Sequence, residues 1–338
     1  MTAGATERPI IVVGCARSGT TLLQVMLHSH PRIAIPPENR FVLPAYFNRL
    51  QFGDLEQAAN RRALAKFIVR RGTKFKDFGL DRRETVARIV SGPPTVGSAL
   101  ATVFRGYAAR FDKPRWGDKR PTYHGYVDIV LRLFPDAQIV HIVRDGRDCA
   151  ASLKKMTWWK RDTYHAISAW GRAIDNMERA ERRWPGVVTR VCYERLVSDP
   201  EAELRDLCAA LGEEYAPAMA DPDGTAAVAV PERKHWHENT RVGPTTKPIG
   251  RWSGDLEPWE VALAEHVLGD RLQRYGYELS GAGRPSARHL ARYRLVDKKV
   301  KARRRSQKLA DRWLRLREHN PVAAQPLPAP ARRIAIPG

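Results

Sequence analysis

Residues 10–21 read IIVVGCARSGTT, and this stretch decides the fold of the amino-terminal half of the 338-residue chain. The apolar run 10–13 predicts a buried strand, and the pattern from Thr20 to His28 predicts a helix that ends at the His30-Pro31 turn. Between them lie a glycine, four residues, a second glycine and a hydroxyl pair, which is the spacing of a phosphate-binding P-loop. Thr20 stands where the Walker lysine is expected. The loop therefore predicts an anion site for a group less charged than a nucleoside triphosphate.

Strand and helix patterns alternate along most of the remaining chain. AQIVHIV, which runs up to Arg144, reads as a buried parallel strand, and VVTRVCYE (187–194) reads as another, followed by the helical EAELRDLCAALG. WGDKRPTYHG (116–125) reads as a loop. We therefore expect an α/β fold, a P-loop-like parallel sheet flanked by helices, with a helical insertion at about 41–110 over the strand ends.

Much of the formal charge of +21 lies at the carboxyl end of the chain. Residues 281–338 hold 16 Lys or Arg against three acids, so they carry +13 and the rest carries +8. We expect a main domain at 1–280 and a basic tail at 281–338, with a weakly amphipathic helix at about 286–318 and a disordered Pro/Ala-rich end. This tail suits an anionic membrane surface, and a solvated helix or a basic arm is the open alternative.

The cysteine pattern and the lengths of the apolar runs argue against a disulfide scaffold, a metal site and a membrane span. The four cysteines show neither CxxC spacing nor the density of a disulfide scaffold, so we expect reduced thiols and no metal site. The sequence has no apolar run of 18 residues and no signal-peptide pattern at its start. We expect a cytoplasmic protein, with a peripheral position at the inner face of the membrane left open by the tail.

Four motifs follow one another between about residues 10 and 275: GCARSGTTLL, VRDGRDCAASL, VCYERLVSDPEAELRDLCAALG and KPIGRWSGDL. In these motifs the sequence resembles the sulfotransferases that use 3′-phosphoadenosine 5′-phosphosulfate (PAPS), most closely the protein-tyrosine and bacterial branches. The resemblance implies direct in-line transfer of a sulfuryl group from PAPS to a hydroxyl acceptor, with 3′-phosphoadenosine 5′-phosphate (PAP) as product and no metal. The acceptor stays open among a carbohydrate, a lipid, a phenol and a tyrosine side chain.

The resemblance also implies a set of cofactor-binding residues. Arg144 and Ser152 would hold the 3′-phosphate, because a guanidinium contacts a phosphate through two donors and a hydroxyl completes the cradle. Without the resemblance, RDGRD reads equally well as a surface turn with salt bridges. The residues implied for the 5′ end are Arg17, Ser18, Gly19, Thr20 and Thr21. Those implied elsewhere around the nucleotide are Tyr193, Lys247 and Arg251.

The chemistry requires cations for the leaving phosphate and a base for the acceptor hydroxyl. Arg17 and Lys119 match the expected cations. Pro121 occupies the position where the small-molecule branch has its histidine base, and Glu38 matches the glutamate base of the protein-tyrosine branch. His124 is the alternative base. The Trp158-Trp159 pair is a candidate lining of the acceptor groove, with core packing as the alternative.

Two other classes of function stay open on sequence alone. One is a P-loop kinase or NTPase, which the threonine at position 20 disfavours. The other is a non-enzymatic polyanion-binding protein that acts through its basic tail. Neither explains four motifs in one order.

Overall fold

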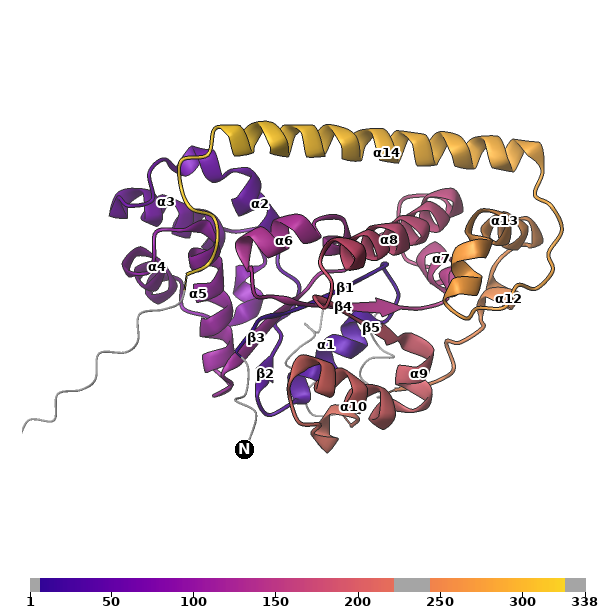
Figure 1. Cartoon of the computed structure of the whole chain (residues 1–338), viewed down its shortest axis with the longest axis horizontal. Helices are drawn as coiled ribbons and strands as arrows, with labels where there is room; N and C mark the ends of the chain where they lie inside the picture. The colour runs from indigo at the N-terminus through magenta and orange to yellow at the C-terminus, as the bar shows by residue number, and fades with distance from the viewer. Residues whose placement is uncertain (1–6, 222–243, 326–338) are drawn as a thin grey trace, which may run out of the picture.

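A computed structural model describes residues 7–221 and 244–325 and contains a five-stranded parallel sheet flanked by helices (Figure 1). The strand order is β2-β3-β1-β4-β5. The strands are β1 (Ile10–Gly14), β2 (Ile33–Ala34), β3 (Arg115–Lys119), β4 (Gln138–Val143) and β5 (Val188–Cys192). Every described pairing is parallel. The predicted α/β class with a parallel sheet is confirmed.

Helices cover both faces of the sheet, and β1 shows how its residues are divided between them. Ile10 and Val12 pack with α1 (Thr20–Ser29), α9 (Tyr193–Ser198) and α10 (Pro200–Leu211). Ile11 and Val13 belong to the core on the opposite face. That second core is formed with the helices α2 (Val42–Phe47), α3 (Ala58–Val69), α4 (Arg82–Ser91), α5 (Val96–Ala109) and α6 (Val127–Leu133). A central strand buried on both faces explains the unbroken apolar run in the sequence.

The stretch that we predicted to be a loop, WGDKRPTYHG, contributes most of β3, so this expectation is wrong. β3 lies beside β1, with Ile10 opposite Gly117, and its residues are buried although three of them are charged. Arg115 donates to the Leu211 carbonyl and to Glu213, each at 3.0 Å. Such contacts with distant residues allow charged side chains to be buried in this strand. The strand therefore lacks the apolar run by which a sequence pattern identifies a buried strand.

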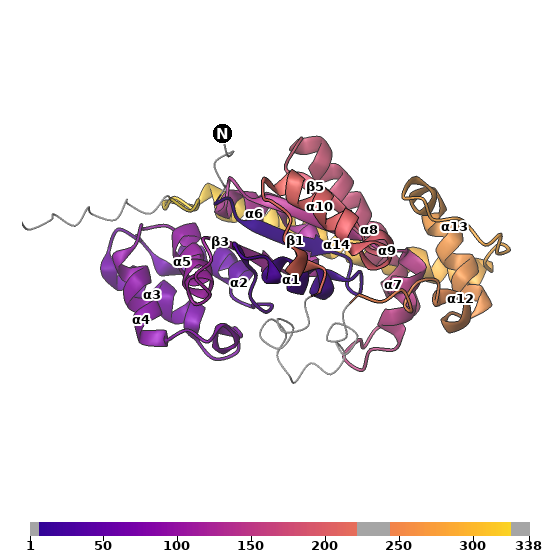
Figure 2. The same ribbon diagram turned by 90° about the horizontal axis from the view of Figure 1, so that it is seen from below.

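The carboxyl-terminal half adds helices along one side of the sheet and a long helix across the molecule (Figures 1 and 2). α14 crosses from the side of α13 to the side of α2 and α3. The elements are α7 (Gly146–Lys154), α8 (Thr163–Arg183), α12 (Trp252–Asp255), α13 (Pro258–Arg274) and α14 (Ala287–Leu316). No helix within the two described ranges is long and apolar enough to cross a membrane.

The start of the Pro/Ala-rich segment differs from our expectation of disorder. Val322 is buried, and its carbonyl accepts a hydrogen bond of 2.8 Å from the Gly97 amide. The Ala324 amide donates to the Leu133 carbonyl at 2.7 Å. A Cβ at Gly97 would lie 2.3 Å from the Ala324 nitrogen, so a glycine on α5 permits this close approach. Residues 326–338 lie outside the described ranges.

A buried histidine on β4 predicts how stability depends on pH. Burial lowers the pKa of His141 to about 3, and the charge of Arg190 adds to this shift. An unfolded histidine has a pKa of about 6.5, so below that pH the unfolded chain binds a proton that the folded chain excludes. The free energy of unfolding should therefore fall as pH drops from 6.5, by up to about 1.4 kcal/mol per pH unit for this residue.

Urea unfolding of the wild type and of His141→Leu at about pH 7.5 and 5.5 tests this dependence. The variant should lose less stability between the two pH values than the wild type. His266→Gln, at an exposed position on α13, is the control and should behave like the wild type. An equal loss in the wild type and in His141→Leu would contradict the assignment.

Candidate anion-binding and catalytic site

A cavity of about 840 Å³ lies at the carboxyl ends of β1 and β4. The two strands are paired, with Gly14 opposite Ile142, so the loops that follow them start side by side. From β1 the chain proceeds to β2 and β3 on one side of the sheet, and from β4 it proceeds to β5 on the other. The cavity therefore lies at the switch point of the topology, where parallel α/β sheets bind ligands.

The glycine loop after β1 has the compact geometry of an anion-binding turn. A Cβ on Gly14 would lie 2.6 Å from Ser18 Oγ and 2.7 Å from the Ile142 carbonyl oxygen, so only glycine fits there. Arg17 (φ 72°) and Gly19 (φ 92°) both adopt left-handed backbone conformations. The turn delivers Thr20 and Thr21 to the amino terminus of α1, where unpaired backbone amides favour an anion.

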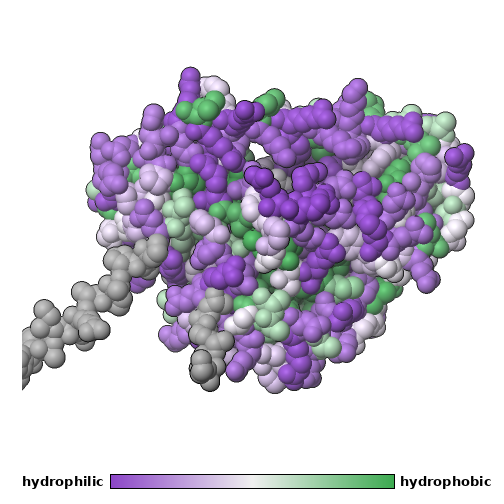
Figure 3. All heavy atoms as spheres, viewed as in Figure 1, coloured by the Kyte–Doolittle hydropathy of each residue, from purple (hydrophilic) through white to green (hydrophobic). Residues whose placement is uncertain are grey.

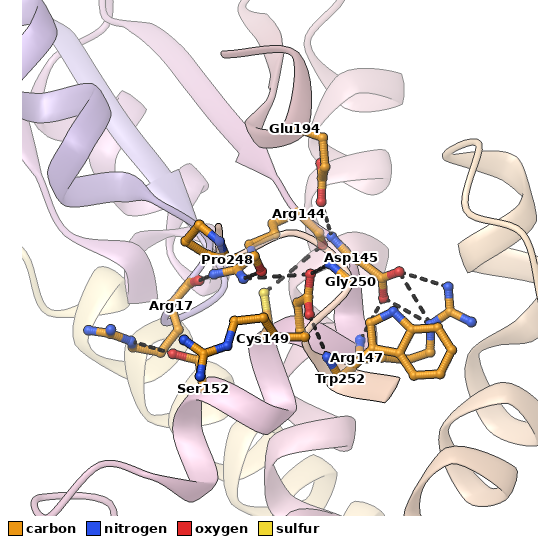
Figure 4. Close-up of polar contacts among 12 residues, drawn as sticks. Arg17, Arg144, Asp145, Arg147, Cys149, Ser152, Glu194, Pro248, Gly250 and Trp252 are labelled. Atoms are coloured by element: carbon orange, nitrogen blue, oxygen red, sulfur yellow. Dashed lines mark hydrogen bonds and ion pairs between the residues drawn. The ribbon is translucent and has the colours of Figure 1, made fainter. Parts of the chain in front are cut away.

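Arg144, directly after β4, is held from three sides. Its Nη1 donates to the Arg17 carbonyl at 3.1 Å, and its Nη2 donates to the Pro248 carbonyl at 2.6 Å (Figure 4). The Tyr193 ring lies against the guanidinium, and the distance from the guanidinium carbon of Arg144 to the ring centroid is 4.6 Å. The Nε of Arg144 is buried and has no hydrogen-bond partner among the described residues. The positioned guanidinium thus retains one buried donor at a cavity wall.

The side chain of Arg17 joins the glycine loop to α7. Its Nε donates to Ser152 Oγ at 3.0 Å (Figure 4). Burial lowers the pKa of Arg17, and the charge of Arg144 adds to this shift. Two guanidiniums that repel one another would both be stabilised by an anion placed between them. The structure therefore brings Arg17, Arg144 and Ser152 into one cluster.

Lys119 and Glu38 form an ion pair beside the first turn of α1. Lys119 Nζ lies 2.6 Å from Glu38 Oε1 and donates to Thr21 Oγ1 at 3.2 Å. The lysine is fully buried, whereas the Glu38 side chain is 28% exposed and lines the cavity. Lys119 thus links the first turn of α1 to a carboxylate that solvent and a ligand can reach.

Two of the residues singled out from the sequence, His124 and Lys247, are not among the described residues that line the cavity, whereas Arg251 is. His124 pairs with Asn176 of α8 at 3.2 Å and is not among the described residues that line the cavity. Burial lowers its pKa to about 3, and the charge of Arg304 adds to this shift. Lys247 is exposed and likewise absent from the described lining, whereas Arg251 lines the cavity with a side chain 55% exposed.

Sequence reasoning missed several cations of the lining, among them Lys74. Lys74 lies in the helical insertion with a left-handed backbone (φ 63°), and burial lowers its pKa. A lysine in a connection between helical segments gives no signal that separates it from a solvated one. The cationic side chains along the cavity are Arg17, Arg40, Lys74, Arg120, Arg144, Lys155 and Arg251. The acidic ones are Glu38, Asp148 and Asp255. The lining therefore favours an anionic ligand.

Two further features bear on the chemistry of the cavity. Trp158 and Trp159 both line it and meet edge to face, with ring centroids 6.2 Å apart, so aromatic surface is available to a ligand. Asp148 accepts hydrogen bonds of 2.9 Å from the amides of Gly250 and Trp252, which fix the segment carrying Arg251. Within the described residues, no group of three or more His, Cys, Asp or Glu is placed to hold a metal ion.

The sequence of this chain is similar to those of several known proteins. The model of the sulfotransferase family matches residues 9–217. An uncharacterized protein of Aquifex aeolicus is 28% identical over 213 residues, which cover 60% of this chain and 25% of that protein. Protein-tyrosine sulfotransferase A of Caenorhabditis elegans is 28% identical over 203 residues, covering 58% of this chain and 47% of that enzyme. The chain thus spans a quarter and about half of the length of these two relatives.

A solved structure gives a match at the level of the fold. The sulfotransferase domain of the olefin synthase from Synechococcus PCC 7002 superposes with a TM-score of 0.58 at 22% identity. The match covers 82% of this chain and 98% of that domain.

The packing of the glycine loop against Tyr193 predicts the effect of a single methyl group. In Gly19→Ala the new Cβ would lie 2.4 Å from the Tyr193 ring on a backbone with positive φ. The backbone strain should cost about 1 kcal/mol, and the clash about 1–3 kcal/mol more. Gly72→Ala is the matched control, because Gly72 has φ 89° and nothing within 4 Å of a built Cβ.

Urea unfolding of the two variants separates strain from clash. Gly19→Ala should lose clearly more free energy of unfolding than Gly72→Ala. Equal losses would show that the loop and Tyr193 are not packed as described.

Proposed function

Because this chain belongs to the sulfotransferase family, we propose that it transfers the sulfuryl group of PAPS to a hydroxyl acceptor by direct in-line displacement. The observation that carries the proposal is the cluster of Arg17, Arg144 and Ser152 at the switch point of the sheet. Two arginines and a hydroxyl that converge beside a lysine-free glycine loop suit a nucleotide with a phosphate at each end of its ribose.

We assign the 5′ end of the nucleotide to the loop after β1 and its 3′-phosphate to the segment after β4. Arg144 and Ser152, with the exposed Arg251 above them, would bind the 3′-phosphate, and the buried Nε of Arg144 supplies a donor for it. The backbone of residues 17–19 and the hydroxyls of Thr20 and Thr21 would bind the 5′ end. Tyr193, which lies between Gly19 and Arg144, would contact the nucleoside. Arg17 lies between both ends and is assigned to both.

In the proposed reaction, the acceptor oxygen forms a bond to sulfur while the bond from sulfur to the 5′-phosphate oxygen breaks. The electron pair of that bond passes to the 5′-phosphate of PAP, where Lys119 and Arg17 would stabilise the charge. Glu38 would take the acceptor proton. Its ion pair with Lys119 holds the carboxylate at the cavity, and transfer of the acceptor proton to Glu38 would free the ammonium to interact with the departing phosphate.

The two rival functions are less well supported by the geometry. A kinase or NTPase would need a loop lysine and a carboxylate available for magnesium. Thr20 replaces the lysine, Asp145 is bonded to Arg147, and Asp148 is bonded to backbone amides. A polyanion-binding scaffold would not need a converging arginine cluster with a buried unpartnered donor. A cytoplasmic location, and peripheral contact of the tail with the inner face of the membrane, are further parts of this proposal.

Calorimetric binding of PAP without magnesium tests the cofactor assignment. Wild type should bind PAP far more tightly than 5′-AMP or ATP. Arg144→Ala should weaken PAP binding by about 10–100-fold, because it removes charge-assisted hydrogen bonds worth about 1.5–3 kcal/mol. Arg182→Ala, at an exposed position on α8, is the control and should bind like the wild type. ATP binding equal to or tighter than PAP binding would overturn the proposed function.

Glu38→Gln tests the base. The substitution preserves shape and removes proton acceptance, so transfer of radiolabelled sulfuryl from PAPS should fall by about 10²–10⁴-fold in kcat, while PAP binding persists. The acceptors are a nitrophenol, a methyl glycoside and a tyrosine peptide. Glu56→Gln, an exposed carboxylate, is the matched control. A kcat that stays within a few-fold of wild type would remove Glu38 from this role.

A further inference from the structure

The outward surface of α14 concentrates the exposed hydrophobic side chains of the molecule. Seven large hydrophobic side chains are exposed in the described residues, and four of them lie on this helix. Their exposed fractions are 53% for Leu295, 67% for Leu309, 51% for Trp313 and 81% for Leu316. Single exposed hydrophobics are ordinary on a protein surface, but a group gathered on one helix indicates a contact surface.

These side chains lie on one stripe of the helix. At about 100° per residue, their positions fall within a sector of about 60°, together with two alanines. We define the outer face of α14 as Ala291, Leu295, Ala302, Leu309, Trp313 and Leu316. One cation, Lys298, interrupts the stripe.

The opposite side of α14 is fixed to the body of the protein, so the outer face cannot turn inward. Val296 is buried in the core formed by α7, α8 and α13. The guanidinium carbon of Arg304 lies 4.5 Å from the Tyr126 ring centroid, and the Tyr126 hydroxyl donates to Gln307 at 3.2 Å. Asp311 lies 3.7 Å from Arg49. Because packing and polar contacts occupy the inner side, the apolar stripe faces away from the protein. α14 runs along the upper edge of Figure 1, and in the same view Figure 3 shows hydrophobic atoms scattered among hydrophilic ones along that edge.

Exposed cations border the stripe on both sides, and few of them have an acidic partner. The helix carries 12 Lys or Arg and two Asp. Along one border lie Arg288, Arg292, Lys299 and Arg303. Along the other lie Arg294, Lys301, Arg305, Lys308 and Arg312. Among these nine, the described ion pairs are Arg292 with Asp162 and Lys301 with Asp297.

We propose that the outer face of α14 docks on an anionic membrane surface. The leucines and Trp313 would enter the boundary between headgroups and acyl chains, and the flanking arginines and lysines would extend sideways to the lipid phosphates. Charge complementarity identifies the occupant, because cations on both borders match a continuous anionic plane. The helix would lie in the interface plane without crossing the membrane.

Two other occupants fit the surface less well. A second copy of the chain would place one strongly cationic helix against another, with repulsion across the interface. A nucleic acid would pair with the cations, but it would leave the leucines of the outer face in water. This inference rests on the membrane contact proposed above for the tail and names the surface that makes it, and it does not depend on the proposed sulfuryl transfer.

Flotation of the full-length chain with vesicles tests the proposal. The vesicles are phosphatidylcholine alone, or phosphatidylcholine with roughly one-third phosphatidylglycerol. Two variants of α14 are compared. One removes apolar contact by Leu309→Ser and Leu316→Ser, and the other removes four charges by Lys299→Gln, Arg303→Gln, Arg305→Gln and Arg312→Gln. The control removes two charges from the exposed end of α8 by Arg182→Gln and Arg183→Gln. PAP binding of each variant reports on the fold and on the cofactor site.

Wild type and the control should bind the anionic vesicles and not the neutral ones, with binding weakened by salt. Each α14 variant should bind the anionic vesicles at least about tenfold more weakly, while PAP binding is unchanged. The leucine variant should still bind duplex DNA as the wild type does, because its charges remain. The proposal is overturned if wild type does not float with anionic vesicles, if the leucine variant floats as well as wild type, or if α14 instead mediates dimerisation. If the wild type does not bind PAP, the cofactor assignment is contradicted, and the membrane proposal is unaffected.

Discussion

The close contact between Gly14 and the backbone of β4 is the constraint on which the site depends. No larger residue fits, because a Cβ would lie 2.7 Å from the Ile142 carbonyl oxygen. This contact lets the loop after β1 turn tightly beside the end of β4, so that the Arg17 carbonyl accepts from Arg144 and the Arg17 side chain reaches Ser152. Motifs more than 120 residues apart in the chain meet here because two neighbouring parallel strands end at the same edge of the sheet.

A second layer of the site rests on charges buried within β3. Asp118 accepts from the Asn39 amide at 2.8 Å and from the Tyr123 hydroxyl at 2.9 Å, which fixes the backbone next to Glu38. Lys119, its neighbour in the strand, points to the other face and pairs with Glu38 itself. Separating the pair would leave the buried charge of Lys119 uncompensated, which is costly. Lys119 on β3 therefore both positions the Glu38 carboxylate and restrains its movement.

Sequence reasoning located the parts of the site that follow local rules. The glycine loop was predicted from the apolar strand before it and from its spacing, whereas Arg144 was implied by the family resemblance; both line the cavity. β3 was missed because its charges are satisfied by residues distant in the chain, such as Glu213 for Arg115. The docking of Val322 was missed for a related reason. The Gly97 amide on α5 donates to the Val322 carbonyl, and the segment can approach so closely only because residue 97 lacks a Cβ, which composition does not reveal. The roles of Glu38 and Lys119 stay predictions, although the structure pairs them.

The two concentrations of positive charge in the chain have different geometries. In the cavity the guanidiniums converge: the half-buried Arg17 and the buried Arg144 both line it, which suits a small anion with a defined shape. On α14 the cations diverge along both borders of an apolar stripe, which suits an extended anionic plane and selects no particular small molecule. The same excess of Arg and Lys therefore implies a compact ligand in one place and a surface in the other, and net charge alone does not distinguish the two. The distinction comes from burial and direction, which depend on how the sheet and α14 pack.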